Sequence, residues 1–196
     1  MATVTVPSSC AVALKEWATV LEALAKGEQL VLIRKGGLIE PGSGFELVSP
    51  TFLFYPTFEH QAVTYLRPPY QRYFDDAVTR RSPPDQVRFE LCGIAVSSVQ
   101  SRDPAIVERL SGFHVYNEDF VTQRLKWQPD QPLAIIVVRT FRLAAPHLLP
   151  VVPRYAGCKS WVDLDTPVSL EGARPVLDEP VFHERARELN RLLASP

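Results

Sequence analysis

The sequence has few cysteines and no long hydrophobic run. The three cysteines (Cys10, Cys92 and Cys158) lie far apart, and an odd number at such spacing indicates neither a disulfide framework nor a zinc site. We therefore expect reduced thiols, as in a cytoplasmic protein. No apolar run approaches the length of a membrane span, and the N-terminal residues lack the basic and apolar regions of a signal peptide. We therefore expect no membrane association.

An excess of charge of one sign is also missing. The 21 lysines and arginines nearly balance the 22 aspartates and glutamates, so the formal net charge is −1. Such a balance provides no overall attraction to nucleic acid or to acidic lipid. A nucleic-acid-binding role therefore requires a local basic surface.

The common catalytic motifs are absent as well. The four histidines are scattered, with no His-x-x-x-His or Cys-x-x-Cys pattern, so we expect no metal site and no cofactor. The chain contains neither the strand-borne acidic pair with an acid-x-lysine of metal-dependent nucleases nor a Gly-x-Ser-x-Gly elbow. These absences leave open whether the protein is an enzyme.

Proline, by contrast, is abundant. The 18 prolines cluster at joints, which predicts many short elements rather than long helices. With 196 residues, of which 46% are hydrophobic, the chain is expected to form a single domain over residues 1–196. Its core is expected over about residues 11–164, followed by a C-terminal helix at about residues 179–194.

Periodicity and capping residues predict an alternation of helices and strands. Helices are expected from Ser8 or Ser9 to about Lys26, over residues 70–81, from Asp103 to Leu110 and from Asn117 to about Lys126. Strands are expected over residues 29–35, 45–48, 51–55, 86–100, 133–143 and 160–164. This order indicates an α+β fold in which helices flank a mixed, curved or barrel-like sheet. Arg139 falls on an apolar face of its strand, so it must be paired, lie beyond the core or follow a bulge.

A basic turn follows the first apolar strand. In Arg34-Lys35-Gly36-Gly37, the glycines let backbone N–H groups approach an anion and the two cations supply charge, so the turn is a candidate phosphate site. On this reading, Lys35→Glu would weaken nucleic-acid binding. The alternative is a strand end with solvated cations and a glycine turn.

A second polar cluster follows the next strand. Thr57 is a possible N-cap for a short helix with Glu59, His60 and Gln61, beside Tyr55. A carboxylate next to an imidazole suits acid–base chemistry. The alternative is a polar helix start whose side chains bond to nearby backbone.

Further candidates suit a binding surface. Arginine contacts phosphates and tyrosine stacks on bases, although a mixed-charge helix face is an alternative here. The interleaved residues are Arg67, Arg72, Arg80, Arg81 and Arg88 with Tyr65, Tyr70 and Tyr73. Trp127, after Arg124 and Lys126, is either a stacking platform or a lid on the core.

Several segments together resemble a known bacterial family, the domain of unknown function 1802. The resemblance covers roughly residues 11–164 and implies no established activity and no catalytic residue. Members are similar to proteins placed beside restriction-type endonuclease domains, which implies a DNA-modification or defence context. The segments are Ala13-Leu14-Lys15-Glu16-Trp17, Leu32-Ile33-Arg34-Lys35-Gly36-Gly37, Phe54-Tyr55-Pro56-Thr57-Phe58-Glu59-His60-Gln61, Arg124-Leu125-Lys126-Trp127-Gln128-Pro129 and Tyr155-Ala156-Gly157-Cys158-Lys159-Ser160-Trp161.

A looser resemblance of element order is to the PUA-like group, which includes ASCH and EVE domains, small β-barrels that hold RNA or modified DNA bases. The leading hypothesis is a nucleic-acid-binding accessory protein that recognises a modified base of DNA or RNA, with a restriction-type endonuclease as partner. A metal-dependent nuclease or other hydrolase using Glu59 and His60, and a protein-interaction module, are the alternatives. The expected ligand-binding residues are Arg34, Lys35, Gly36, Tyr55, Thr57, Glu59, His60, Gln61 and Trp127.

Overall fold

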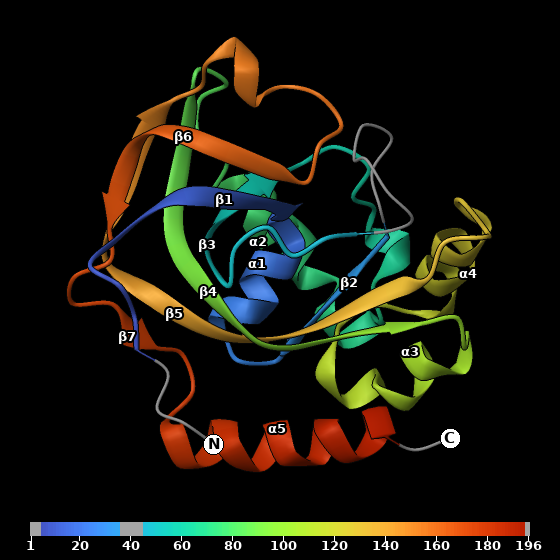
Figure 1. Ribbon diagram of the computed structural model, residues 1–196. Coiled ribbons are helices and arrows are strands. Elements are labelled where there is room, and N and C mark those ends of the chain that lie inside the picture. Colours follow the sequence, from blue (N-terminus) through green and yellow to red (C-terminus); the bar gives the residue numbers. More distant parts are fainter. Residues whose placement is uncertain (1–4, 36–44, 195–196) are drawn as a thin grey trace.

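The computed structural model describes residues 5–35 and 45–194 (Figure 1). In this part of the chain, seven strands form one sheet with the order β2-β5-β4-β3-β1-β6, and β7 also pairs with β5. The strands are β1 (Ser9–Trp17), β2 (Val31–Arg34), β3 (Thr51–Thr57), β4 (Gln86–Ser101), β5 (Leu133–Pro150), β6 (Trp161–Ser169) and β7 (Arg174–Pro175).

The sheet is mixed and strongly curved. β1 pairs with β3 in parallel, whereas every other pair of strands is antiparallel. β4 and β5 form a long ribbon whose register shifts between Phe89 and Leu91 and again between Ala95 and Ser97. Such shifts bend and twist a ribbon, and Figure 1 shows both strands sweeping around the inner helices. The predicted α+β class with a mixed, curved sheet is confirmed, although the sheet ends at β2 and β6 and does not close.

Five α-helices accompany the sheet in the described residues. They are α1 (Ala18–Ala25), α2 (Arg72–Thr79), α3 (Ala105–Arg109), α4 (Glu118–Lys126) and α5 (Glu179–Ala194). Figure 1 shows α1 and α2 within the curve of the sheet and α5 along its lower side. No helix in the part of the chain that the structure describes combines the length and apolar character that crossing a bilayer requires.

The core occupies both faces of the central strands. Phe52 and Phe54 belong to the larger cluster, beneath the helices, while Leu53 between them belongs to a second cluster on the opposite face. Alternate side chains of a strand point to opposite faces, so β3 is buried on both. At Gly93 of β4, a Cβ atom would lie 2.9 Å from the Phe54 ring and 2.8 Å from Val138. The absence of a side chain there leaves room for Phe54 and Val138, which both belong to the larger cluster.

Several predicted elements are found where the sequence placed them. Strands β2, β4 and β5 begin within two residues of the expected positions, and α2 and α4 match their predicted segments. The side chain of Asn117 caps α4 by accepting a hydrogen bond from the backbone N–H of Phe120. Arg139 is buried and paired, with 3.7 Å to Glu179 and its guanidinium over Phe182.

The prediction for the first helix is wrong in its first half. Residues from Ser9 to Trp17 form strand β1, and only Ala18–Ala25 are helical. Leu14 and Trp17 have helical spacing, but pairing with β3 on one side and β6 on the other decides the conformation. The predicted helix end is confirmed, because Gly27 follows α1 with a φ of 70°.

Two predictions in the next segment are also wrong. The expected strand over residues 45–48 is irregular. Thr57 is the last residue of β3 rather than a helix N-cap, and its hydroxyl donates to the backbone oxygen of Glu16. Residues 58–62 are irregular, with a turn at Glu59 and His60 in which His60 has a φ of 63°. The parallel neighbour β1 extends β3 to Thr57 and thereby prevents the short helix.

Candidate functional site

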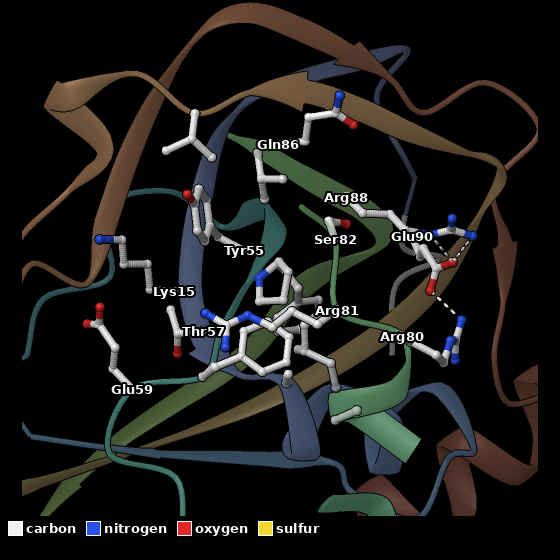
Figure 2. Close-up of a pocket in the computed structure, with 18 of the residues that line it drawn as sticks. Lys15, Tyr55, Thr57, Glu59, Arg80, Arg81, Ser82, Gln86, Arg88 and Glu90 are labelled. Carbon is white, nitrogen blue, oxygen red and sulfur yellow. Dashed lines mark hydrogen bonds and ion pairs between the residues drawn. The ribbon is translucent and has the colours of Figure 1, made fainter. Parts of the chain in front are cut away.

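A cleft of about 320 Å³ opens between the end of β3, helix α1 and the connection from α2 to β4 (Figure 2). Its volume lies within the usual range for ligand-binding sites. Its lining comes from β1, α1, β3, the α2–β4 connection, β4 and the segment after β5, so the cleft exists only in the folded chain. The lining includes Lys15, Glu22, Tyr55, Thr57, Phe58, Glu59, Arg80, Arg81, Ser82, Gln86, Arg88 and Glu90.

Two cations of the lining have no ion-pair partner among the residues that the structure describes. The exposed Arg81 places its guanidinium 4.6 Å from the centre of the Phe58 ring. Lys15 donates to the backbone oxygen of Gly157 at 3.0 Å and lies 5.6 Å from the Tyr55 ring centre. Figure 2 shows Lys15 and Arg81 on different sides of the same opening. The cleft therefore offers positive charge to an anionic ligand.

The ionisable groups at the Lys15 end influence one another. Burial lowers the pKa of Lys15, and the nearby cation Lys159 lowers it further, while Glu59 acts in the opposite direction. Burial raises the pKa of Tyr55, so this phenol stays neutral at ordinary pH. Tyr55 therefore offers an uncharged aromatic face and a hydroxyl at this end of the cleft.

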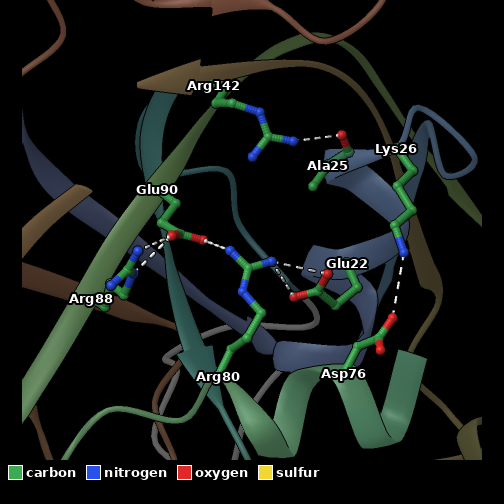
Figure 3. A network of polar contacts seen from close by, with 8 residues as sticks. All are labelled: Glu22, Ala25, Lys26, Asp76, Arg80, Arg88, Glu90 and Arg142. Carbon is green, nitrogen blue, oxygen red and sulfur yellow. Dashed lines mark hydrogen bonds and ion pairs between the residues drawn. The ribbon is translucent and has the colours of Figure 1, made fainter. Parts of the chain in front are cut away.

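A neutral network closes the other end of the cleft (Figure 3). Arg80, just after α2, binds Glu22 of α1 at 3.0 Å and Glu90 of β4 at 2.7 Å. Arg88 binds the same Glu90 carboxylate at 2.7 Å. Two cations and two carboxylates thus cancel one another and join α1, α2 and β4.

The basic turn predicted as a phosphate site has internal partners. The guanidinium of Arg34 donates to the backbone oxygen of Lys15 at 3.1 Å and to the Ser160 hydroxyl at 3.0 Å, and it pairs with Glu16 at 3.3 Å. Lys35 is buried, with 5% of the residue exposed, and its ammonium donates to the backbone oxygens of the last turn of α4. Burial lowers the pKa of Lys35. Both side chains are thus engaged within the fold rather than facing the cleft.

The structure brings three of the predicted site residues together. Tyr55, Thr57 and Glu59 line the cleft, whereas Arg34, Lys35, His60, Gln61 and Trp127 are not part of its lining. The amide oxygen of Gln61 accepts from the backbone and hydroxyl of Thr19, and Trp127 is 43% exposed just after α4. Gly36 lies outside the described residues.

Sequence reasoning did not select Lys15 and Phe58, and it could not separate Arg81 from its neighbours. Four of the five interleaved arginines have partners. Arg67 donates to backbone oxygens, Arg72 contacts Tyr73, and Arg80 and Arg88 bind carboxylates. The alternation of arginine and aromatic residues was the signal that pointed to the Arg81 side of the cleft. Among the described residues, no group of three or more His, Cys, Asp or Glu side chains is arranged to hold a metal ion.

Comparison with known proteins identifies the family. The model of the family described as "Domain of unknown function (DUF1802)" matches residues 13–188, and the chain therefore belongs to that family. No curated protein matches the sequence.

Three crystal structures of ASCH from Zymomonas mobilis resemble the fold. A first variant has a TM-score of 0.43 and 11% identity over 94% of this chain and 99% of that chain. A second variant has a TM-score of 0.42 and 9% identity over 91% of this chain and 96% of that chain. The third structure, of ASCH with no named substitution, has a TM-score of 0.41 and 10% identity over 91% of this chain and 94% of that chain. At these low scores and identities, the likeness carries no argument about function.

Proposed function

We propose that this protein binds a single-stranded segment of DNA or RNA in the cleft between β3, α1 and the α2–β4 connection. The observation that carries the proposal is the Arg81 guanidinium, which lies over Phe58 with no ion-pair partner among the described residues. A guanidinium beside an aromatic ring can contact phosphate with its N–H groups and stack on a base with its planar face. The neighbouring Tyr55 adds an aromatic surface on which a base can stack.

The size and charge of the cleft favour a single strand over a duplex. The opening is concave and of small-ligand size, about 320 Å³, and a base reaches such a recess only when it is unpaired. With a net charge of −1, the molecule provides no general attraction to a polyanion. Affinity must therefore come from local cations such as Arg81 and Lys15.

Fluorescence anisotropy with labelled single- and double-stranded DNA and RNA, over a salt series, tests the proposal. We expect binding to single strands that weakens as salt rises. Arg81→Gln is expected to weaken it about fivefold, since an exposed charge contact contributes up to about 1 kcal/mol. Arg142→Gln is the matched control, because Arg142 is an exposed arginine outside the cleft lining. No binding at low salt, or equal losses in both variants, would contradict the proposal.

Recognition of a modified base and partnership with a restriction-type endonuclease extend this proposal. Their support is the family resemblance and the cleft that suits one unpaired base. Including modified bases in the panel, and co-purifying the protein with a candidate endonuclease, tests each part separately. If the protein binds single strands equally well with and without modified bases, recognition of a modified base is refuted and single-strand binding still stands.

The hydrolase alternative is tested with the same oligonucleotides. Glu59 lines the cleft, whereas the adjacent His60 does not, so the two side chains do not form one site in this structure. Cleavage that requires a divalent metal and disappears in Glu59→Gln would favour the enzyme over the binding protein. If cleavage were lost in His60→Ala as well, Glu59 and His60 would act together, as the sequence predicted.

A further inference from the structure

The carboxylate of Glu90 lies between two arginines at one end of the cleft. Arg80 contacts one of its oxygens at 2.7 Å, and Arg88 contacts the other at 2.7 Å. Both arginine side chains are at least 40% exposed, and Glu90 is 24% exposed. Figure 3 shows the two guanidiniums approaching Glu90 from opposite sides. The arrangement is an anion site that an internal carboxylate fills.

Carboxylate and phosphate oxygens fit the same guanidinium edge. Because solvent reaches both ion pairs, an incoming anion can replace Glu90 at little cost. The exchange favours a ligand with more negative charge than a carboxylate. A phosphodiester carries a single charge, whereas a phosphate monoester carries nearly two near neutral pH and has three acceptor oxygens.

We propose that Arg80 and Arg88 form a subsite for a terminal phosphate monoester, which displaces Glu90. The identity of the ligand as a nucleic-acid strand end rests on the proposed function, since the same four charged side chains line that cleft. In the structure Glu22 holds Arg80 by two contacts of 3.0 and 3.2 Å, and the exchange does not require either contact to break. The guanidinium therefore stays in place while Glu90 turns away.

Oligonucleotides that differ only in a terminal phosphate test the subsite in the wild-type protein. We expect the phosphorylated strand to bind about fivefold more tightly than its hydroxyl counterpart at pH 7.5. The preference should shrink at pH 5, where the monoester carries a single charge, and should disappear in Arg88→Gln. Equal affinity for the two strands at pH 7.5 would overturn the inference and leave the proposed function intact.

Two matched variants test the exchange with inorganic phosphate alone. Glu90→Gln and Glu22→Gln each remove one carboxylate from Arg80, but only Glu90 contacts both arginines. We expect Glu90→Gln to strengthen phosphate binding several-fold and Glu22→Gln to leave it nearly unchanged. Equal strengthening would mean that net charge alone is responsible, and would overturn the inference even if no oligonucleotide binds.

Discussion

Replacing Arg34 by methionine should destabilise the fold strongly, because this side chain connects the two ends of an open sheet. Arg34 ends β2, at one end of the sheet, while Ser160 immediately precedes β6 at the other. The guanidinium reaches Ser160 at 3.0 Å and the Glu16 carboxylate of β1 at 3.3 Å. The side chains of Arg34 and Glu16 are only 12% and 4% exposed.

The size of the loss follows from the carboxylate that remains. Removing one partner of a buried ion pair costs about 3–5 kcal/mol, because the other charge is left buried without its counterion. Arg34 Nε is buried and has no hydrogen-bond partner among the described residues, so the pair is incompletely satisfied. We therefore expect the lower end, about 3 kcal/mol. For a chain of this size, that corresponds to a fall in Tm of about 6–12 °C.

Urea unfolding followed by circular dichroism measures this free energy. Arg142→Met is the control, because that exposed arginine makes one hydrogen bond, to the backbone oxygen of Ala25, and should cost no more than about 1 kcal/mol. Adding Glu16→Gln to Arg34→Met should recover part of the loss, since the carboxylate that Arg34 neutralises is then also removed. If Arg34→Met costs no more than Arg142→Met, or the second substitution recovers nothing, the ion pair does not hold the sheet ends together.

Two further predictions concern packing and pH. Gly93→Ala should lower the free energy of unfolding by about 1–3 kcal/mol, because the new methyl group would collide with Phe54 and Val138. Gly112→Ala, where a Cβ meets nothing within 4 Å, is its control in the same thermal melts. Burial lowers the pKa of His114 to about 4. The stability that neutral His114 contributes is therefore complete above its unfolded pKa of about 6.5 and is lost as pH falls toward 4, roughly 3 kcal/mol in all. Urea titrations from pH 7 to pH 4 should show a shallower decline for His114→Gln than for the wild type, and parallel declines would refute this assignment.

Local sequence patterns predicted the helices and strands correctly where the local preference and the tertiary contacts favour the same conformation. Val87, Phe89 and Leu91 alternate with polar residues, and all three are buried in β4 as expected. Residues 9–17 have helical spacing of apolar side chains, yet two neighbouring strands pair with them. The local sequence does not show that these strands will pair with residues 9–17, since β6 lies more than a hundred residues away in the sequence.

The same limit applies to the site. Arg80 and Arg81 are adjacent and chemically identical, but of these two only Arg80 pairs with Glu22 and Glu90. Arg34 and Lys35 have the composition of a phosphate-binding turn, and their partners come from β1, the start of β6 and α4. Sequence alone could indicate a region rich in arginine and aromatic residues, but only the fold decides which cations remain available to a ligand.

Whether nucleic acid binds in the cleft is tested most directly by amide NMR spectra recorded as a short single-stranded oligonucleotide is added. We predict that the shifted signals cluster in residues 55–59 and 80–88, together with the backbone amide of Lys15, because these segments supply much of the cleft lining. Signals from α5, on the lower side of the sheet in Figure 1, should not move. Shifts centred elsewhere, or none at saturating oligonucleotide, would contradict the assignment of this cleft as the binding site.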